Sequence, residues 1–392
     1  MEFENLKFLI QVPGLYFHIP FCRRACHYCN FHFSTSLARK DEMINAMMLE
    51  FVRRSENITG KPNIVETIYF GGGTPSLLSL SNLSGILNLV REHFVMAPDV
   101  EITLEANPDD ITHAALYDWK HIGINRLSIG VQSFGQDDLV WMNRAHNDIQ
   151  AIDALKLAKQ SGFDNFSVDL IFGTPTLSDS DWKRNVDVLI NSVTPHIAAY
   201  ALTVEPSTAL DLMIRNKKKE MIDPGKQAAQ FLMLIEWLEQ AGYEHYEISN
   251  FCKPGKRSRH NTSYWKGIPY IGIGPSAHSY DGATRSWNVS NNTLYLKKIK
   301  NKEIAYEEEI LSNVQRLNEY IMTSLRTMEG IDLSKVENLF GKNYADQLMK
   351  GSQKYLNNQN ISLENKHLRL TRPGKLFADG ITADLFFTSK ET

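Results

Sequence analysis

LYFHIPFCRRACHYC, residues 15–29, is a β-rich run that leads directly into three cysteines within eight residues. Cys22, Cys26 and Cys29 follow the pattern Cys-x3-Cys-x2-Cys. Cysteines this close together are not typical of the disulfide frameworks of secreted proteins. Because thiolates are soft ligands that suit zinc or iron–sulfur clusters, the stretch predicts a metal site at the end of a strand.

Two kinds of metal site are compatible with this loop. A structural zinc site needs four ligands, and His18, His27 or His32 could supply the fourth. Three cysteines on a four-iron cluster instead leave one iron open, and an open position can bind a small molecule. We favour a [4Fe-4S] cluster held by the three cysteines and keep zinc as the alternative.

Around this stretch, short β-rich runs alternate with amphipathic helical patterns through the first 240 residues. Parallel strands need crossovers that helices usually supply, so the alternation predicts an α/β fold with an open or closed barrel of six βα units. We expect strands at 15–19, 67–70, 101–104, 126–129, 167–172 and 197–202, and helices at 40–56, 82–94, 113–121, 149–160, 181–191 and 227–240.

The residues that follow these strands are polar or glycine-rich. Active sites of such folds lie at the carboxyl ends of the strands, so these residues should share one rim. Each could instead belong to an ordinary turn or surface. The rim would hold Cys22, Gly71, Gly72, Gly73, Thr74, Glu105, Gln132 and Asp169.

The pattern changes near residue 291. Helical runs are expected at 313–326, 333–340 and 345–355, followed by a hairpin at 361–371 with its turn at Asn365-Lys366. This order predicts a small winged-helix-like α+β domain. We expect it to pack or act as a lid, because it has no basic recognition helix for DNA. The predicted division is 1–290 for the barrel with its connecting segment and 291–392 for the C-terminal domain.

Composition and charge narrow the class of protein. With 43% hydrophobic and 22% charged residues, the 392-residue chain is typical of folded globular proteins. The net charge of -3 differs from the strongly positive charge that nucleic-acid-binding proteins usually carry. We see no stretch of 18 apolar residues and no signal-peptide layout, so a cytoplasmic location without a membrane span is expected.

The cysteine pattern after a barrel strand resembles the signature of the radical S-adenosylmethionine (SAM) superfamily, whose open iron chelates the methionine amino and carboxylate groups. Glu105 could accept a hydrogen bond from an ammonium group, Arg144 could clamp a carboxylate, and Gln132 and Asp169 could accept from ribose hydroxyls. By this resemblance, the contacts to SAM are expected to be Tyr16, Gly72, Gly73, Thr74, Glu105, Gln132, Arg144 and Asp169.

Longer motifs make the resemblance more specific. LYFHIPFC at 15–22, GGGTP at 71–75, IGVQSF at 129–134 and DLIFG at 169–173 are similar to the oxygen-independent coproporphyrinogen III oxidase family. The similarity covers nearly the whole chain, including its C-terminal part. It implies a radical SAM partial (β/α)6 TIM-like barrel followed by the C-terminal domain of that family.

The chain departs from the true coproporphyrinogen dehydrogenases in two places. Phe31 stands where those enzymes have a fourth cysteine, and only 21 residues precede Cys22. Both departures resemble the HemW-type heme chaperones, and HNTSYW at 260–265 is similar to their His-Asn-x-x-Tyr-Trp motif. That resemblance implies heme contacts at His260, Tyr264 and Trp265. The alternative for His260 is a hydrogen-bonded histidine at a domain junction.

Three functions follow from these resemblances. The first is a heme chaperone that uses a [4Fe-4S] cluster and SAM, binds heme and passes it to heme proteins such as respiratory enzymes. The second is an oxygen-independent coproporphyrinogen III dehydrogenase that produces protoporphyrinogen IX. The third, RNA modification, is disfavoured by the acidic balance of the chain. Whether SAM is cleaved or only bound is left open, and a homodimer is possible.

Overall fold

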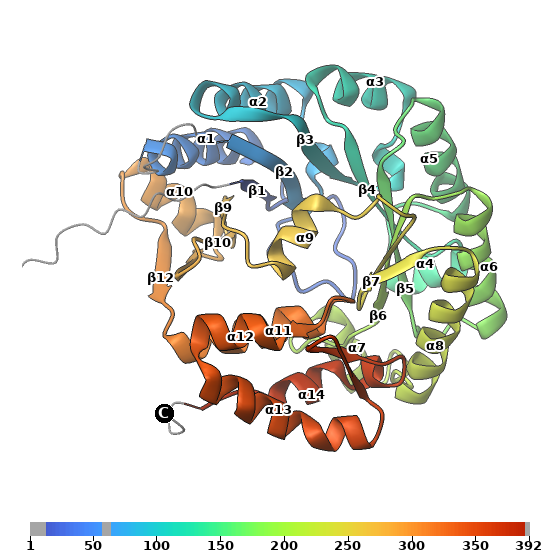
Figure 1. Cartoon of the computed structure of the whole chain (residues 1–392). Coiled ribbons are helices and arrows are strands. Elements are labelled where there is room, and N and C mark those ends of the chain that lie inside the picture. Colours follow the sequence, from blue (N-terminus) through green and yellow to red (C-terminus); the bar gives the residue numbers. More distant parts are fainter. Residues whose placement is uncertain (1–12, 57–63, 389–392) are drawn as a thin grey trace, which may run out of the picture.

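A parallel sheet forms the centre of the molecule (Figure 1). The computed structural model describes residues 13–56 and 64–388. Over these residues each strand from β1 to β6 pairs in parallel with the next along the chain. The six βα units are therefore confirmed. The strands are β1 (Gly14–Ile19), β2 (Ile64–Gly72), β3 (Val95–Ala106), β4 (Arg126–Gln132), β5 (Phe166–Phe172) and β6 (His196–Ala201).

Helices cover the outer face of this sheet (Figure 1). The strands are largely buried, as the pattern of β5 shows. Residues such as Phe17, Ile68 and Leu127 form the core between sheet and helices. The covering helices are α1 (Lys40–Glu56), α2 (Leu80–His93), α3 (His113–Ile122), α5 (Asp148–Gln160), α6 (Asp179–Asn191) and α8 (Pro224–Gln240).

Short strands extend the sheet at both edges, and the sequence reading missed them. β9 (Tyr270–Ile273) pairs in parallel with β1, and β10, β11 and β12 continue antiparallel. At the other edge β8 (Asn250–Cys252) and β7 (Glu244–Glu247) follow β6. Strands of three to five residues contain too few alternations to give a periodic signal. The other elements missed are β10 (His278–Tyr280), β11 (Thr284–Asn288), β12 (Tyr306–Ile310), α4 (Gln136–Met142), α7 (Ala209–Arg215), α9 (Arg259–Trp265), α10 (Asn292–Lys300), β13 (Ile331–Asp332) and α14 (Ala378–Asp384).

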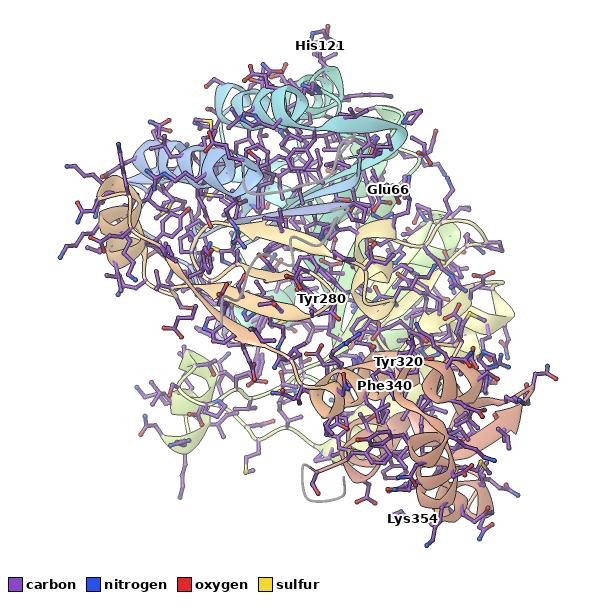
Figure 2. The ribbon with its side chains drawn as sticks, turned by 60° about the vertical axis from the view of Figure 1, so that its left-hand side comes forward. Glu66, His121, Tyr280, Tyr320, Phe340 and Lys354 are labelled. Carbon is purple, nitrogen blue, oxygen red and sulfur yellow. The ribbon has the colours of Figure 1, made fainter. Side chains whose placement is uncertain are left out.

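The C-terminal unit contains helices and a small sheet of order β13-β15-β14. Its own apolar cluster includes Leu317, Val336 and Leu368, and Figure 2 marks the unit with Tyr320, Phe340 and Lys354. Asn365 and Lys366 have φ of 50° and 63°, as a two-residue hairpin turn requires, so the predicted hairpin is confirmed. The elements are α11 (Asn313–Leu325), β13 (Ile331–Asp332), α12 (Leu333–Phe340), α13 (Lys342–Asn357), β14 (Ile361–Glu364), β15 (His367–Leu370) and α14 (Ala378–Asp384).

The segment between the barrel and this unit packs with the barrel. Helix α10 packs against α1, and β12 pairs with β11 in the large sheet. The division at residue 290 stays a prediction. Within 13–56 and 64–388, no helix combines the length and apolar character needed to cross a membrane.

Candidate functional site

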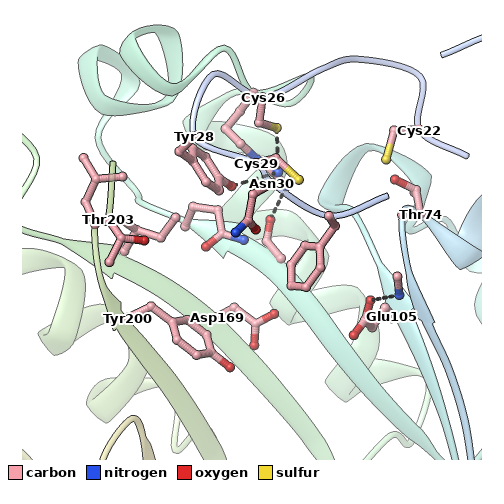
Figure 3. A pocket seen from close by; sticks show the side chains of 18 of the residues that line it. Cys22, Cys26, Tyr28, Cys29, Asn30, Thr74, Glu105, Asp169, Tyr200 and Thr203 are labelled. Atoms are coloured by element: carbon pink, nitrogen blue, oxygen red, sulfur yellow. Dashed lines mark hydrogen bonds between the residues drawn. The ribbon is translucent and has the colours of Figure 1, made fainter. Parts of the chain in front are cut away.

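A cavity of about 600 Å³ lies at the carboxyl ends of the barrel strands (Figure 3). Its volume is within the usual range for small-molecule sites. Among the described residues that line it, Tyr16 does not appear, because its ring packs beside Tyr69 and His260 instead. The predicted site residues that do line it are Cys22, Cys26, Cys29, Gly72, Gly73, Thr74, Glu105, Gln132, Arg144 and Asp169.

The cysteine loop is held by backbone hydrogen bonds on several sides. Cys22 N donates to Ser34 O at 3.1 Å, and Thr74 N donates to Phe21 O at 2.7 Å. His27 N donates to Met142 O at 3.1 Å, so the middle of the loop is tied to α4. These ties hold the loop across the cavity, where Figure 3 shows the three sulfur atoms.

The three cysteines of this loop are partly buried. Burial raises the pKa of Cys22 to about 11 and also raises the pKa of Cys29. Iron binds thiolates, so loading a cluster here must displace protons. The donor set, three soft sulfur ligands from one loop, fits an iron–sulfur cluster.

The zinc alternative needs a histidine beside the three cysteines. The histidines named for the fourth position have other partners. His18 Nε2 lies 2.9 Å from His32 O, His32 Nε2 lies 2.7 Å from Asn292 Oδ1, and His27 Nδ1 lies 3.1 Å from Trp141 O.

Two partly buried carboxyl groups face the cavity from neighbouring parts of the sheet. Glu105 on β3 accepts from the Tyr69 hydroxyl at 2.8 Å and from Gly72 N at 3.2 Å. Asp169 on β5 accepts from Ser128 Oγ at 3.3 Å. Burial raises the pKa of Glu105 to about 7 and that of Asp169 to about 6. Both groups can therefore titrate near neutrality and can accept hydrogen bonds from a ligand.

Arg144 lies beside the cysteine loop. Its Nη1 is 3.2 Å from Cys26 Sγ, and its Nη2 donates to Asn107 Oδ1 at 2.8 Å and to Gly130 O at 2.7 Å. Arg144 Nε and Gln132 Oε1 are buried, and neither has a hydrogen-bond partner among the described residues. Unpartnered buried polar atoms on a cavity wall fit a polar ligand such as a zwitterionic nucleoside.

Gly73, in the glycine run 71–73, is required by the protein's own backbone. A Cβ on Gly73 would lie 2.5 Å from Phe21 O and 2.7 Å from Ile19 O. Gly73 N also donates to Ile19 O at 2.8 Å. Close packing of the loop after β2 against β1 thus explains Gly73, while its predicted contact with SAM stays a prediction.

Gly73→Ala is expected to lower the free energy of unfolding by roughly 2–3 kcal/mol, because backbone rather than a flexible side chain would have to shift. Urea unfolding followed by circular dichroism measures this. Gly380→Ala is the matched control, since a Cβ there meets nothing within 4 Å in α14. Its stability should be unchanged or higher by about 1 kcal/mol. Equal stability of the Gly73 variant and wild type would contradict the explanation.

His260 is buried in α9 with both ring nitrogens hydrogen-bonded. Nδ1 lies 2.8 Å from Thr67 Oγ1, and Nε2 lies 2.8 Å from the Tyr264 hydroxyl. Burial lowers the pKa of His260 to about 3, so the imidazole is neutral. This is the arrangement of the hydrogen-bonded alternative. Within the described part of the cavity lining, His260, Tyr264 and Trp265 do not appear, and their contact with heme stays a prediction.

Sequence reasoning missed several lining residues. Tyr28 and Asn107 contact Arg144, and Tyr200 adds an aromatic wall beside Asp169 (Figure 3). Arg326 and Asp379 come from the C-terminal unit. No motif marked these positions, because only the folding of distant segments brings them to the cavity.

The barrel and its cysteine loop define the class of the protein. The model of the Radical SAM superfamily matches residues 16–189, and the model of the HemN C-terminal domain matches residues 311–377. Coproporphyrinogen III oxidase (HemN) from Escherichia coli has the same fold, with a TM-score of 0.85, 22% identity, and coverage of 97% of this chain and 91% of that chain. The predicted fold class is confirmed.

Curated relatives narrow the class to a family. "Heme chaperone HemW" of Mycobacterium tuberculosis (strain H37Rv) is 33% identical, covering 96% of this chain and 95% of the relative. "Heme chaperone HemW" of Bacillus subtilis is 31% identical, covering 94% and 98%. The chain therefore belongs to the HemW family of radical SAM proteins. Membership of the radical SAM superfamily implies a [4Fe-4S] cluster and SAM, and the residues above fit both.

Proposed function

We propose that this protein is a heme chaperone that binds heme and delivers it to heme proteins. The observation that carries the proposal is identity above 30% over nearly the full length of relatives named as heme chaperones. Phe31 adds support, because this cavity-lining side chain is 66% exposed and offers no thiol where the dehydrogenases have a fourth cysteine. We further propose two domains, a cytoplasmic location, a heme-accepting protein as partner and a possible homodimer.

In this proposal the cavity holds the cofactors. Cys22, Cys26 and Cys29 would hold the cluster, which would supply redox chemistry beside the bound SAM. Arg144 orients the SAM carboxylate, Glu105 accepts from its amino group, and Gln132 and Asp169 accept from its ribose. Gly72, Gly73 and Thr74 complete the proposed contacts at the cavity, while the contact of Tyr16, which is not among the lining residues, stays a prediction from the sequence.

Anaerobic reconstitution of the cluster followed by heme titration tests the function. The protein is titrated with and without SAM, and coproporphyrinogen III turnover is assayed in the same sample. Tight heme binding without turnover is expected. Turnover to protoporphyrinogen IX without tight heme binding would overturn the proposal in favour of the dehydrogenase.

A pair of variants tests His260 as the heme ligand. Tyr264→Phe removes the hydroxyl that occupies Nε2, so heme affinity is expected to rise roughly 2- to 5-fold. His260→Ala is expected to lower heme affinity by about tenfold or more and to change the heme absorption spectrum. His121→Ala is the control, because His121 is an exposed residue of α3, labelled at the top of Figure 2. Wild-type spectra and affinities in both variants would make His260 purely structural.

SAM affinity is expected to depend on the ionisation of Asp169. The pKa of Asp169 is raised to about 6, mainly by burial, so its carboxylate is lost as the pH falls below about 6. Affinity should then fall by at most about tenfold per pH unit. Asp169→Asn should bind SAM more weakly and keep only the pH dependence that Glu105 contributes. Glu105 is raised to a pKa of about 7, so Glu105→Gln separates its contribution. An unchanged pH profile in Asp169→Asn would refute the role.

A further inference from the structure

Arg326 brings a guanidinium group from the C-terminal unit into the wall of the barrel cavity. It follows the last residue of α11, and its carbonyl oxygen accepts from Ile248 N at 3.0 Å. Thr327 forms a β-bridge with Glu247, and Met328 N donates to Tyr246 O at 3.0 Å. These backbone bonds to the β7–β8 segment set the position from which the Arg326 side chain reaches the cavity.

The two carboxylates that hold Arg326 differ in how firmly they are placed. Glu247 is fully buried, contacts Arg326 Nε at 3.2 Å, and also accepts from Ser249 N at 3.0 Å and Asn250 Nδ2 at 2.6 Å. Asp379, on α14, contacts Nη1 at 3.2 Å, yet its side chain is 93% exposed. Such exposed ion pairs contribute little to stability. Glu247 is therefore a fixed partner, while Asp379 can be exchanged.

The neighbouring groups of the cavity complement this cation. Phe31 and Phe33 of the cysteine loop line the same cavity, and the guanidinium lies 5.5 Å from the centroid of the Trp265 ring. Arg144, in contrast, already contacts Cys26, Tyr28, Asn107 and Gly130. The cavity thus combines aromatic rings, which pack on flat apolar ligands, with a second arginine suited to a carboxylate.

We propose that Arg326 binds a propionate carboxylate of the tetrapyrrole, and that Asp379 occupies this position on Arg326 until the ligand displaces it. The inference rests on the proposed heme-binding function and deepens it by naming an anchoring residue. A planar guanidinium forms paired hydrogen bonds with a carboxylate, so Arg326 selects free-acid tetrapyrroles over their esters.

Titration of the cluster-loaded full-length protein with hemin and with hemin dimethyl ester tests the proposal. Arg326→Gln is expected to weaken hemin binding about tenfold, because a charge-assisted bond is lost. Asp379→Asn is expected to strengthen hemin binding about 2- to 3-fold, because the competing carboxylate is gone. Asp384→Asn is the matched control on α14, since Asp384 pairs with Lys354 and Tyr355 instead. The diester should bind the wild type more weakly and respond to none of these changes.

The outcomes separate this inference from the proposed function. Failure of the wild-type protein to bind hemin would overturn both the inference and the proposed function. If Arg326→Gln weakened the binding of hemin and of hemin dimethyl ester equally, the inference alone would be overturned. A loss confined to SAM affinity would also overturn it, since the methionine carboxylate would then be the ligand of Arg326. If Arg326→Gln fails to fold because Glu247 loses its partner, Asp379→Asn decides: unchanged or weaker hemin binding overturns the proposal.

Discussion

Cys22→Ala, Cys26→Ala and Cys29→Ala are each expected to abolish the iron–sulfur cluster, with loss of nearly all bound iron and of the absorbance in the blue visible region. A four-iron cluster with one iron open for SAM needs three protein thiolates. The loop has three cysteines, so none of them is spare. The described structure places the remaining cysteine, Cys252, in the buried strand β8 rather than at the cavity. Iron and sulfide analysis after anaerobic reconstitution measures the effect.

Cys252→Ala is the matched control for these variants. Its thiol lies in the core, so its removal is expected to cost some stability and to leave the iron content at the wild-type level. A full cluster in all three loop variants would refute the assignment of the ligands. Loss of the cluster from the Cys252 variant alone would point to a different metal site.

Arg144→Ala is expected to weaken SAM binding roughly 30- to 100-fold while the cluster remains. The reason is the loss of a charge-assisted hydrogen bond to the carboxylate, worth about 2–3 kcal/mol, in a buried position. Calorimetric titration of the reconstituted protein with SAM, beside iron analysis of the same sample, separates the two effects.

Arg23→Ala controls for the loss of a positive charge from the same loop region. Arg23 pairs with Asp110 and its side chain is more than half exposed, so SAM affinity should change little. Unchanged affinity in Arg144→Ala would remove this residue from the site. Loss of the cluster in that variant would show that Arg144 supports the loop through Cys26 instead.

The barrel was predictable because its signals are local and repeated. Strand β5 is an apolar run buried along almost its whole length, and helix α1 begins and ends where the pattern at 40–56 predicted. Parallel topology followed from the crossovers. The edge strands β9 to β12 were not predictable, since such short segments become strands only when a neighbouring strand offers free backbone groups.

The functional site likewise contains residues that were predictable from the sequence and residues that only packing brings to the cavity. Residue types and their spacing were enough to predict the cysteine loop and the family. They also predicted the strand-end residues Glu105, Gln132 and Asp169, because the carboxyl ends of parallel strands meet at one edge of the sheet. Packing between distant segments, and not spacing along the chain, brings Arg326 and Asp379 to the cavity and places Thr67 at Nδ1 of His260. These contacts join segments up to about 200 residues apart, so their geometry is set by packing, which no local pattern encodes.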